Sequence, residues 1–131
     1  MQSLRRFGSV SKNERGIILT LPETYWSAVR SSSFSPTADP KISSLGELLA
    51  NNPDYRVVIE AHTDDKGTPE ELSSLTEQRA HLIADRLSGF GVTNTRIEVK
   101  GMGATLPVAP NTTNANRARN RRVNLILVPN I

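Results

Sequence analysis

Residues 60–67, with the sequence EAHTDDKG, place an imidazole and adjacent carboxylates directly after the apolar run YRVVI at 55–59. Three kinds of site use such residues: a metal site, a catalytic site, and a pocket that recognises charged groups. A polar strand end that enters a solvated turn is the alternative without a ligand. The rest of the chain has to decide among these four interpretations.

Metal binding and catalysis find little support elsewhere in the sequence. Zinc takes three or four His, Cys or carboxylate ligands, but the chain has no cysteine, and its histidines, His62 and His81, lie far apart. No nucleophile and base can be paired from the sequence. Gly101 and Gly103 lack the lysine and the following helix of a phosphate-binding loop. We therefore expect no metal, no cofactor and no catalysis, and interpret His62 as a structural residue whose ring hydrogen-bonds nearby backbone.

Arg79 lies where an apolar residue is expected. The stripe around it follows helical spacing and consists of Leu72, Leu75, Leu82, Ile83 and Leu87. A guanidinium in this stripe needs anionic partners, because an unpaired buried charge costs several kcal/mol. The alternative is that the guanidinium of Arg79 snorkels to solvent at an edge of the core, or forms a purely structural ion pair.

The nearest candidate partner of Arg79 is Asp64, in the turn that leads into the same helix. Two opposite charges held side by side can bind a ligand that carries both an ammonium and a carboxylate. Each charge-assisted hydrogen bond to such a ligand is worth roughly 1.5–3 kcal/mol. The EAHTDDKG turn and Arg79 together therefore favour charge recognition.

A second basic cluster surrounds Asn120 and consists of Arg117, Arg119, Arg121 and Arg122. Because side chains alternate along a strand, Arg121 and Arg122 are expected on opposite faces. One of them can join a pocket at the start of the strand, and the other is expected in solvent. Taken alone, the cluster is also typical of a solvated basic loop or a nucleic-acid patch.

Hydrophobic periodicity predicts the elements that position these residues. Strands are expected at 16–22, 56–62, 95–101 and 121–129, and helices from Pro40 to about residue 51 and from Pro69 to about Ser88. The order β-α-β-α-β-β indicates an α+β fold, a two-layer sandwich with both helices packed on one face of a mixed sheet.

The ends of the helices are also marked in the sequence. Asp39 is expected to cap the first helix, with Pro40 at its first position. Pro69 opens the second helix, and Gly89 and Gly91 end it. Residues 101–120 are expected to form a long irregular connection with room for a short helical turn.

Size and composition predict one domain. The chain has 131 residues, is 37% hydrophobic and carries a formal net charge of +3, which suits a single core. We expect a flexible N-terminal segment at 1–14 and the domain at 15–131. Because the N-terminus has no long apolar stretch, membrane attachment is expected only through parts outside this chain. Nothing in the sequence sets an oligomeric state.

The chain resembles the OmpA C-terminal-like domain shared by OmpA, Pal and MotB-type proteins. Five pieces carry the resemblance in order: VVIEAHTDDKG at 57–67, LTEQRA at 75–80, GVTNTRI and GMG within 91–103, PVAPNT at 107–112, and RARNRRV at 117–123. The resemblance implies a non-enzymatic, periplasmic domain that binds peptidoglycan and tethers the outer membrane or an envelope complex to the cell wall.

The implied ligand is the diaminopimelate residue of the peptidoglycan stem peptide, whose side-chain end carries an ammonium and a carboxylate. Position by position, the binding residues of the family fall on Asp64, Arg79 and Arg121, with Thr63, Gly67 and Asn120 in support. A degenerate fold that serves as a protein–protein assembly module without wall binding is the alternative. A nucleic-acid binder that uses Arg117–Arg122 is a remote third.

The sequence departs from the pattern of the family in three places. Ala28 and Arg30 stand where acids are typical, which predicts a more positive pocket. Leu72 replaces an asparagine that contacts the ligand in the family. Asn124 stands where a glutamate is common.

Overall fold

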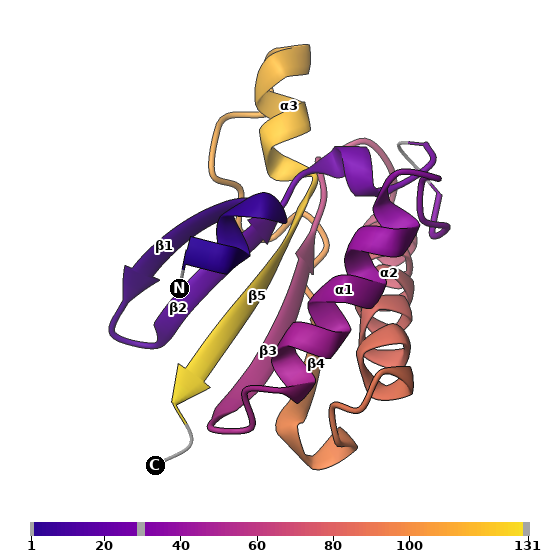
Figure 1. The fold of residues 1–131 in the computed structure, drawn as a ribbon. Coiled ribbons are helices and arrows are strands. Elements are labelled where there is room, and N and C mark those ends of the chain that lie inside the picture. The colour runs from indigo at the N-terminus through magenta and orange to yellow at the C-terminus, as the bar shows by residue number, and fades with distance from the viewer. Residues whose placement is uncertain (1, 29–30, 130–131) are drawn as a thin grey trace.

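The computed structural model describes residues 2–28 and 31–129 of the chain. Figure 1 shows how strands and helices follow one another within these residues. The elements are η1 (Gln2–Arg6), β1 (Ser9–Asn13), β2 (Gly16–Leu21), η2 (Glu23–Tyr25), α1 (Ala38–Ala50), β3 (Tyr55–His62), α2 (Pro69–Gly89), η3 (Asn94–Arg96), β4 (Ile97–Gly101), α3 (Asn114–Asn120) and β5 (Arg122–Pro129), where η denotes a 3-10 helix.

The strands of the described residues form one mixed sheet in the order β1-β2-β5-β3-β4. β3 and β4 are parallel and are connected through α2, whereas β5 is antiparallel to both of its neighbours, β2 and β3. α1 and α2 cover one face of the sheet, and α3 stands beside the start of β5 (Figure 1). The prediction of an α+β fold with helices on one face of a mixed sheet is confirmed.

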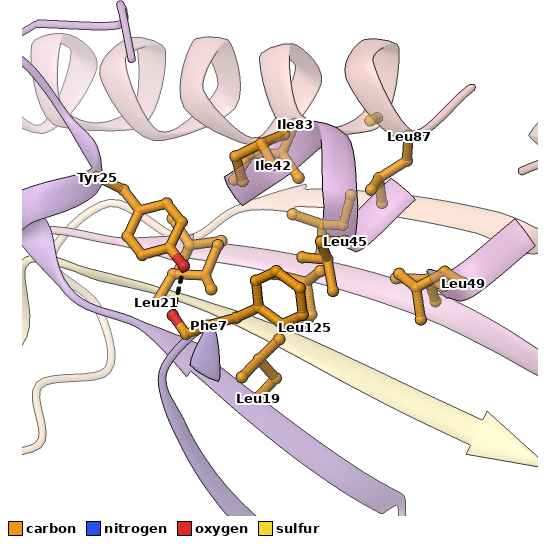
Figure 2. Packing of buried hydrophobic residues seen from close by; sticks show 14 of the residues in the cluster. Phe7, Leu19, Leu21, Tyr25, Ile42, Leu45, Leu49, Ile83, Leu87 and Leu125 are labelled. Carbon is orange, nitrogen blue, oxygen red and sulfur yellow. Dashed lines mark hydrogen bonds between the residues drawn. The ribbon is translucent and has the colours of Figure 1, made fainter. Parts of the chain in front are cut away.

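Alternation along the strands gives the sheet a core face and an outer face. Leu19 of β2, Ile59 of β3 and Leu125 of β5 are fully buried on the core face. They join one hydrophobic cluster with Ile42 and Leu45 of α1, and with residues of α2 (Figure 2). Burial of each such side chain contributes roughly 1.5–3 kcal/mol, so the helices are held to the sheet mainly by this layer.

The N-terminal segment differs from the expectation of a flexible tail over 1–14. β1 pairs with β2 along its whole length, and Leu4 and Phe7 lie in the core with 0% and 3% exposure. The hydroxyl of Tyr25 donates a hydrogen bond of 2.5 Å to the carbonyl of Phe7. The folded part of the chain therefore includes residues before 15, because two apolar side chains anchor them.

The helix ends match the sequence at α2 and differ at α1. Thr68 caps α2 by accepting a hydrogen bond from the amide of Glu71, and Pro69 occupies the first turn. α1 begins at Ala38, one residue before the expected cap, because the carbonyl of Ser35 accepts from the amides of Ala38 and Asp39. The carboxylate of Asp39 instead pairs with Arg86 of α2.

The connection after β4 contains α3, whose first turn is capped by the hydroxyl of Thr113. Among the described helices, none combines the length and the apolar character that a membrane span needs.

Candidate ligand-binding site

Asp64 lies just beyond the end of β3 and is held there by its own turn. Its side chain is 1% exposed, and Oδ1 accepts a hydrogen bond of 3.0 Å from the amide of Lys66. This arrangement is an Asx turn, in which a short acid stabilises the reversal that follows it. Gly67 completes the reversal with a φ of 145°, a value that side-chain-bearing residues rarely adopt. The turn therefore fixes the direction of the Asp64 carboxylate.

The loop after β4 is hydrogen-bonded to the residue that precedes this turn. The amide of Thr63 donates to the carbonyl of Gly103 at 3.0 Å. The amide of Gly103 in turn donates to the hydroxyl of Thr76, a buried residue of α2, at 3.0 Å. Thr63 thus supports Asp64 through its backbone, and the start of α2 and the turn are tied to one loop.

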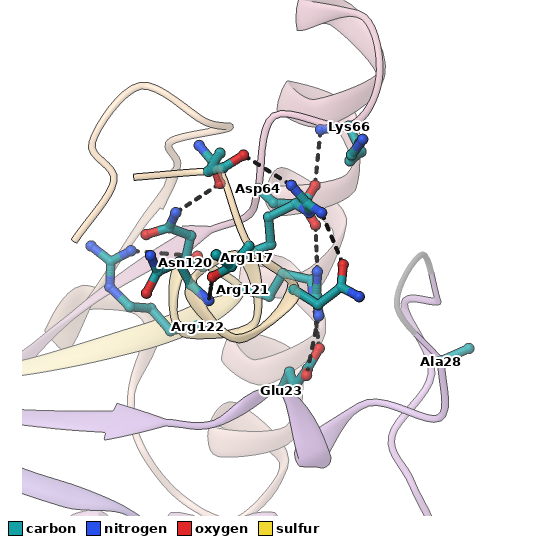
Figure 3. Close-up of polar contacts among 12 residues, drawn as sticks. Glu23, Ala28, Asp64, Lys66, Arg117, Asn120, Arg121 and Arg122 are labelled. Atoms are coloured by element: carbon teal, nitrogen blue, oxygen red, sulfur yellow. Dashed lines mark hydrogen bonds and ion pairs between the residues drawn. The ribbon is translucent and has the colours of Figure 1, made fainter. Parts of the chain in front are cut away.

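Arg121 brings the C-terminal part of the chain to Asp64. Its Nη1 donates to Oδ2 of Asp64 at 2.5 Å, and its Nε donates to Oε2 of Glu23 at 2.5 Å (Figure 3). Nη2 adds a bond of 3.3 Å to the other oxygen of Glu23. The planar guanidinium therefore forms a two-pronged contact with Glu23 and still reaches Asp64, which an ammonium could not do.

The charge of Arg121 is strongly favoured in this position. The hydrogen bond to Glu23 raises the pKa of Arg121 above its ordinary value, burial opposes this rise, and the bond to Asp64 adds to it. One half-buried cation is thus shared by two carboxylates that come from η2 and from the turn after β3.

Arg79 reaches the segment that follows η2. Its side chain is 1% exposed, so the alternative of snorkelling to solvent is wrong. Nε donates to the carbonyl of Ser31 at 2.8 Å, and Nη2 donates to the carbonyl of Ala28 at 3.1 Å. The guanidinium also lies over the ring of Trp26, 4.7 Å from the ring centroid. The direct pairing of Arg79 with Asp64 stays a prediction.

Asn120 supports the site by holding a loop. Its side chain is fully buried. Oδ1 accepts from the amides of Val108 and Ala109 at 2.8 and 3.1 Å, and Nδ2 donates to the carbonyl of Ala109 and to Asn111 at 2.8 Å. Because Asn120 directly precedes Arg121, these bonds fix the point from which Arg121 extends.

Two expectations for neighbouring residues are wrong. Arg122 is 8% exposed and does not point into solvent. Its guanidinium donates to the carbonyls of Leu106 and Asn120, and burial lowers its pKa. His62 is 3% exposed, and neither ring nitrogen has a hydrogen bond among the described residues. Burial, together with the charge of Arg122, lowers the pKa of His62 to about 4, so the ring is neutral at pH 7.

The three departures from the family pattern have different outcomes. Leu72 is 5% exposed and lines a recess of about 570 Å³ near the start of α2, together with Lys66 and Gln78. The side chain of Asn124 accepts a hydrogen bond from Thr20 on the neighbouring strand. Ala28 is exposed and contributes its carbonyl to Arg79, and Arg30 lies outside the described residues.

Sequence reasoning missed Glu23 and Trp26. Glu23 follows β2 after a single proline, so it holds the same kind of position at a strand end as Asp64 does. That parallel is the signal that could have identified it.

For a metal, the described residues offer no group of three or more His, Cys, Asp or Glu side chains.

A model of the OmpA family matches residues 28–121, which is more than half of the chain. The chain belongs to the OmpA family. The probable lipoprotein YiaD of Escherichia coli is 31% identical to this OmpA-family chain over 121 residues, which cover 92% of the chain and 55% of YiaD. The peptidoglycan-binding protein ArfA of Mycobacterium tuberculosis is 36% identical over 86 residues, which cover 66% of the chain and 26% of ArfA.

Solved structures agree with this membership at the level of the fold. A putative MotB-like protein from Desulfovibrio vulgaris superimposes with a TM-score of 0.86 over 98% of this chain and 90% of that one, at 24% identity. The chain spans about half of YiaD and a quarter of ArfA.

Proposed function

We propose that this domain binds peptidoglycan non-covalently through the diaminopimelate residue of the stem peptide. Binding without catalysis would tether the outer membrane or an envelope complex to the cell wall from the periplasm. Relatives whose names refer to peptidoglycan binding or peptidoglycan association support this proposal.

The observation that carries the proposal is the sharing of Arg121 between Asp64 and Glu23. The group forms a fixed arrangement of acids and a guanidinium at the end of the sheet. The ammonium of the ligand would be bound by the carboxylates, and its carboxylate by the arginines, each through charge-assisted hydrogen bonds.

Arg79 has a specific part in this proposal. Its guanidinium donates to the backbone carbonyls of Ala28 and Ser31. A carboxylate is a stronger acceptor for a guanidinium than a neutral carbonyl. The ligand would therefore compete with the segment around Ala28 and Ser31 for the same donors.

Sedimentation with purified sacculi tests the function. The parent should pellet with sacculi at moderate salt, and Asp64→Asn should not, because the variant keeps the shape of the side chain but removes the charge that faces the ammonium. Asp65→Asn is the matched control, since Asp65 is adjacent but exposed. A folded Asp64→Asn variant that pellets like the parent contradicts the proposal.

The assembly-module alternative has one observation in its favour. Leu72 presents an apolar side chain to the recess near α2, where the family pattern has a polar ligand contact. Under that alternative the parent itself would fail to pellet with sacculi. A nucleic-acid binder would instead show binding that falls steeply with salt.

A further inference from the structure

A second concave surface lies on the outer face of the sheet, away from α1 and α2. It is a groove of about 640 Å³ whose floor comes from β1, β2 and β5 and whose wall comes from α3 and Val108. Glu23 and Arg121 line the groove as well as forming the charged group with Asp64. The groove is therefore continuous with the candidate ligand-binding site.

The floor of the groove carries a row of neutral polar groups. Ser9 of β1 faces Thr20 of β2, and Thr20 faces Asn124 of β5 in the register of the sheet. Neighbouring strands lie about 4.8 Å apart, so this row extends roughly 10 Å. Ser11 and Ile18 form the next pair along the strands, and they place another hydroxyl beside an apolar surface.

Several side chains in this row have polar atoms that form no hydrogen bond with the described residues. The hydroxyl of Thr20 donates to Oδ1 of Asn124 at 2.9 Å, which leaves the amide Nδ2 of Asn124 without a hydrogen bond to the described residues. The hydroxyls of Ser9 and Ser11 likewise have none within the described chain. A row of hydroxyl and amide groups next to CH surfaces matches a sugar ring, which presents hydroxyl and acetamido groups at its rim and CH groups on its faces.

The charges around the groove suit the same occupant. Arg119 lines the wall, is exposed, and forms no ion pair with the described residues. The other charges in the groove are engaged: Arg121 with Glu23 and Asp64, and Arg122 with backbone carbonyls. A neutral sugar would lie along the floor, with Arg119 near the carboxylates of an attached peptide.

From this geometry we propose that the groove binds an N-acetylated amino sugar of the glycan strand to which the stem peptide is attached. The inference rests on the proposed function, since the sugar would be placed there by the peptide bound at Asp64. The domain would then recognise the junction between glycan and peptide, and not the peptide alone.

The test compares two ligands with the same peptide. A muropeptide, in which a disaccharide carries the stem peptide, and the free stem peptide are titrated separately into ¹⁵N-labelled protein. The muropeptide should bind about tenfold more tightly, as expected for a few added hydrogen bonds. It alone should shift the signals of Ser9, Ser11, Thr20 and Asn124, while both ligands shift those of Asp64 to Gly67.

A double variant and a matched control test whether the hydroxyls of β1 cause this difference in affinity. Ser9→Ala with Ser11→Ala should reduce the muropeptide to the affinity of the free peptide. Lys12→Ala, on the same strand but on its other face, should leave the tenfold difference unchanged.

The outcomes separate the two proposals. If both ligands bind equally and shift only the signals of Asp64 to Gly67, the sugar groove is wrong and the proposed function stands. If neither ligand shifts any signal at Asp64, the proposed function fails and the groove proposal fails with it. Shifts along the unpaired edge of β1 with a peptide that lacks sugar would assign the groove to a polypeptide and overturn the inference.

Discussion

The guanidinium of Arg79 lies over the ring of Trp26, 4.7 Å from its centroid. Trp26 stacks on Phe34 with a centroid distance of 5.1 Å, and Arg86 lies over Phe34 at 5.2 Å. Two arginines seven residues apart on α2 thus each contact one ring of a stacked pair. This arrangement holds the segment after η2 against the helix and orients Arg79 toward the carbonyls of that segment.

Arg79→Lys should weaken binding of the diaminopimelate stem peptide at least tenfold. An ammonium cannot reproduce two directed hydrogen bonds together with the planar contact on Trp26, and the loss of one charge-assisted bond alone corresponds to roughly a tenfold change. Arg86→Lys is the matched control, because Arg86 makes the same kind of ring contact seven residues farther along α2. Calorimetric titration measures both. Equal losses in the two variants would assign the effect to the aromatic contact and not to the ligand.

The domain should distinguish a stem peptide that carries diaminopimelate from one that carries lysine. A peptide with lysine in place of diaminopimelate lacks the second carboxylate, so Arg79 and Arg121 would lose their ligand partner. We expect the lysine peptide to bind at least roughly tenfold more weakly than the diaminopimelate peptide. It should also cause smaller shifts of the amide signals of Thr63 to Gly67 and of Arg121. Identical titration curves for the two peptides would contradict recognition of the zwitterionic end.

His62 should make the domain less stable in acid. Its pKa is lowered to about 4 in the folded chain, against about 6.5 in the unfolded chain, so the unfolded state binds more protons between these values. The stabilising contribution is complete above pH 6.5 and is lost as the pH falls toward 4, by about 3 kcal/mol in total. Urea unfolding at several pH values measures the slope.

A substitution isolates this contribution. His62→Phe should flatten the slope between pH 6.5 and pH 4, because the ring nitrogens have no hydrogen bonds to the described residues that the change would break. His81→Phe, at an exposed position of α2, is the matched control for exchanging an imidazole for a phenyl ring. An unchanged slope in His62→Phe would mean that other groups carry the acid sensitivity.

Gly101→Ala should destabilise the domain by more than about 2 kcal/mol, as expected for a clash in a packed region. A Cβ at Gly101 would lie 2.6 Å from the backbone nitrogen of Glu77 in α2, closer than real contacts allow. Gly89→Ala is the control, because nothing lies within 4 Å of its Cβ position, and it should stabilise by about 0.5–1 kcal/mol. Thermal unfolding of both variants checks the pair. Equal stability would show that β4 and α2 can separate at this point.

Local periodicity was sufficient to predict the position of Arg79 and most of the fold. The helical spacing around Arg79 put it on the buried face of α2, and the structure confirms that burial. The end of the strand at His62 likewise predicts that Asp64 lies at the C-terminal end of that strand. Both predictions needed only residues that are close in sequence.

The contacts that could not be predicted join distant parts of the chain. Arg121 and Glu23 are 98 residues apart and meet because β5 lies between β2 and β3, an order that periodicity does not encode. The burial of Arg122 depends on the carbonyl of Leu106, in a loop without a repeating pattern. β1 forms an edge strand where a flexible segment is predicted, and its mostly exposed polar side chains give no periodic signal for a strand.

The central position of β5 has a consequence for how the domain folds. β1 pairs with β2, and β3 with β4, but only β5 connects these two pairs within the sheet. A growing chain that has not yet reached residue 122 leaves β2 and β3 with unpaired edges, which invite pairing with other chains. Because Arg121 directly precedes β5, the charged group with Glu23 and Asp64 closes in the same step that joins the two halves. A partly synthesised or C-terminally truncated domain would be prone to aggregation and would also lack its binding site.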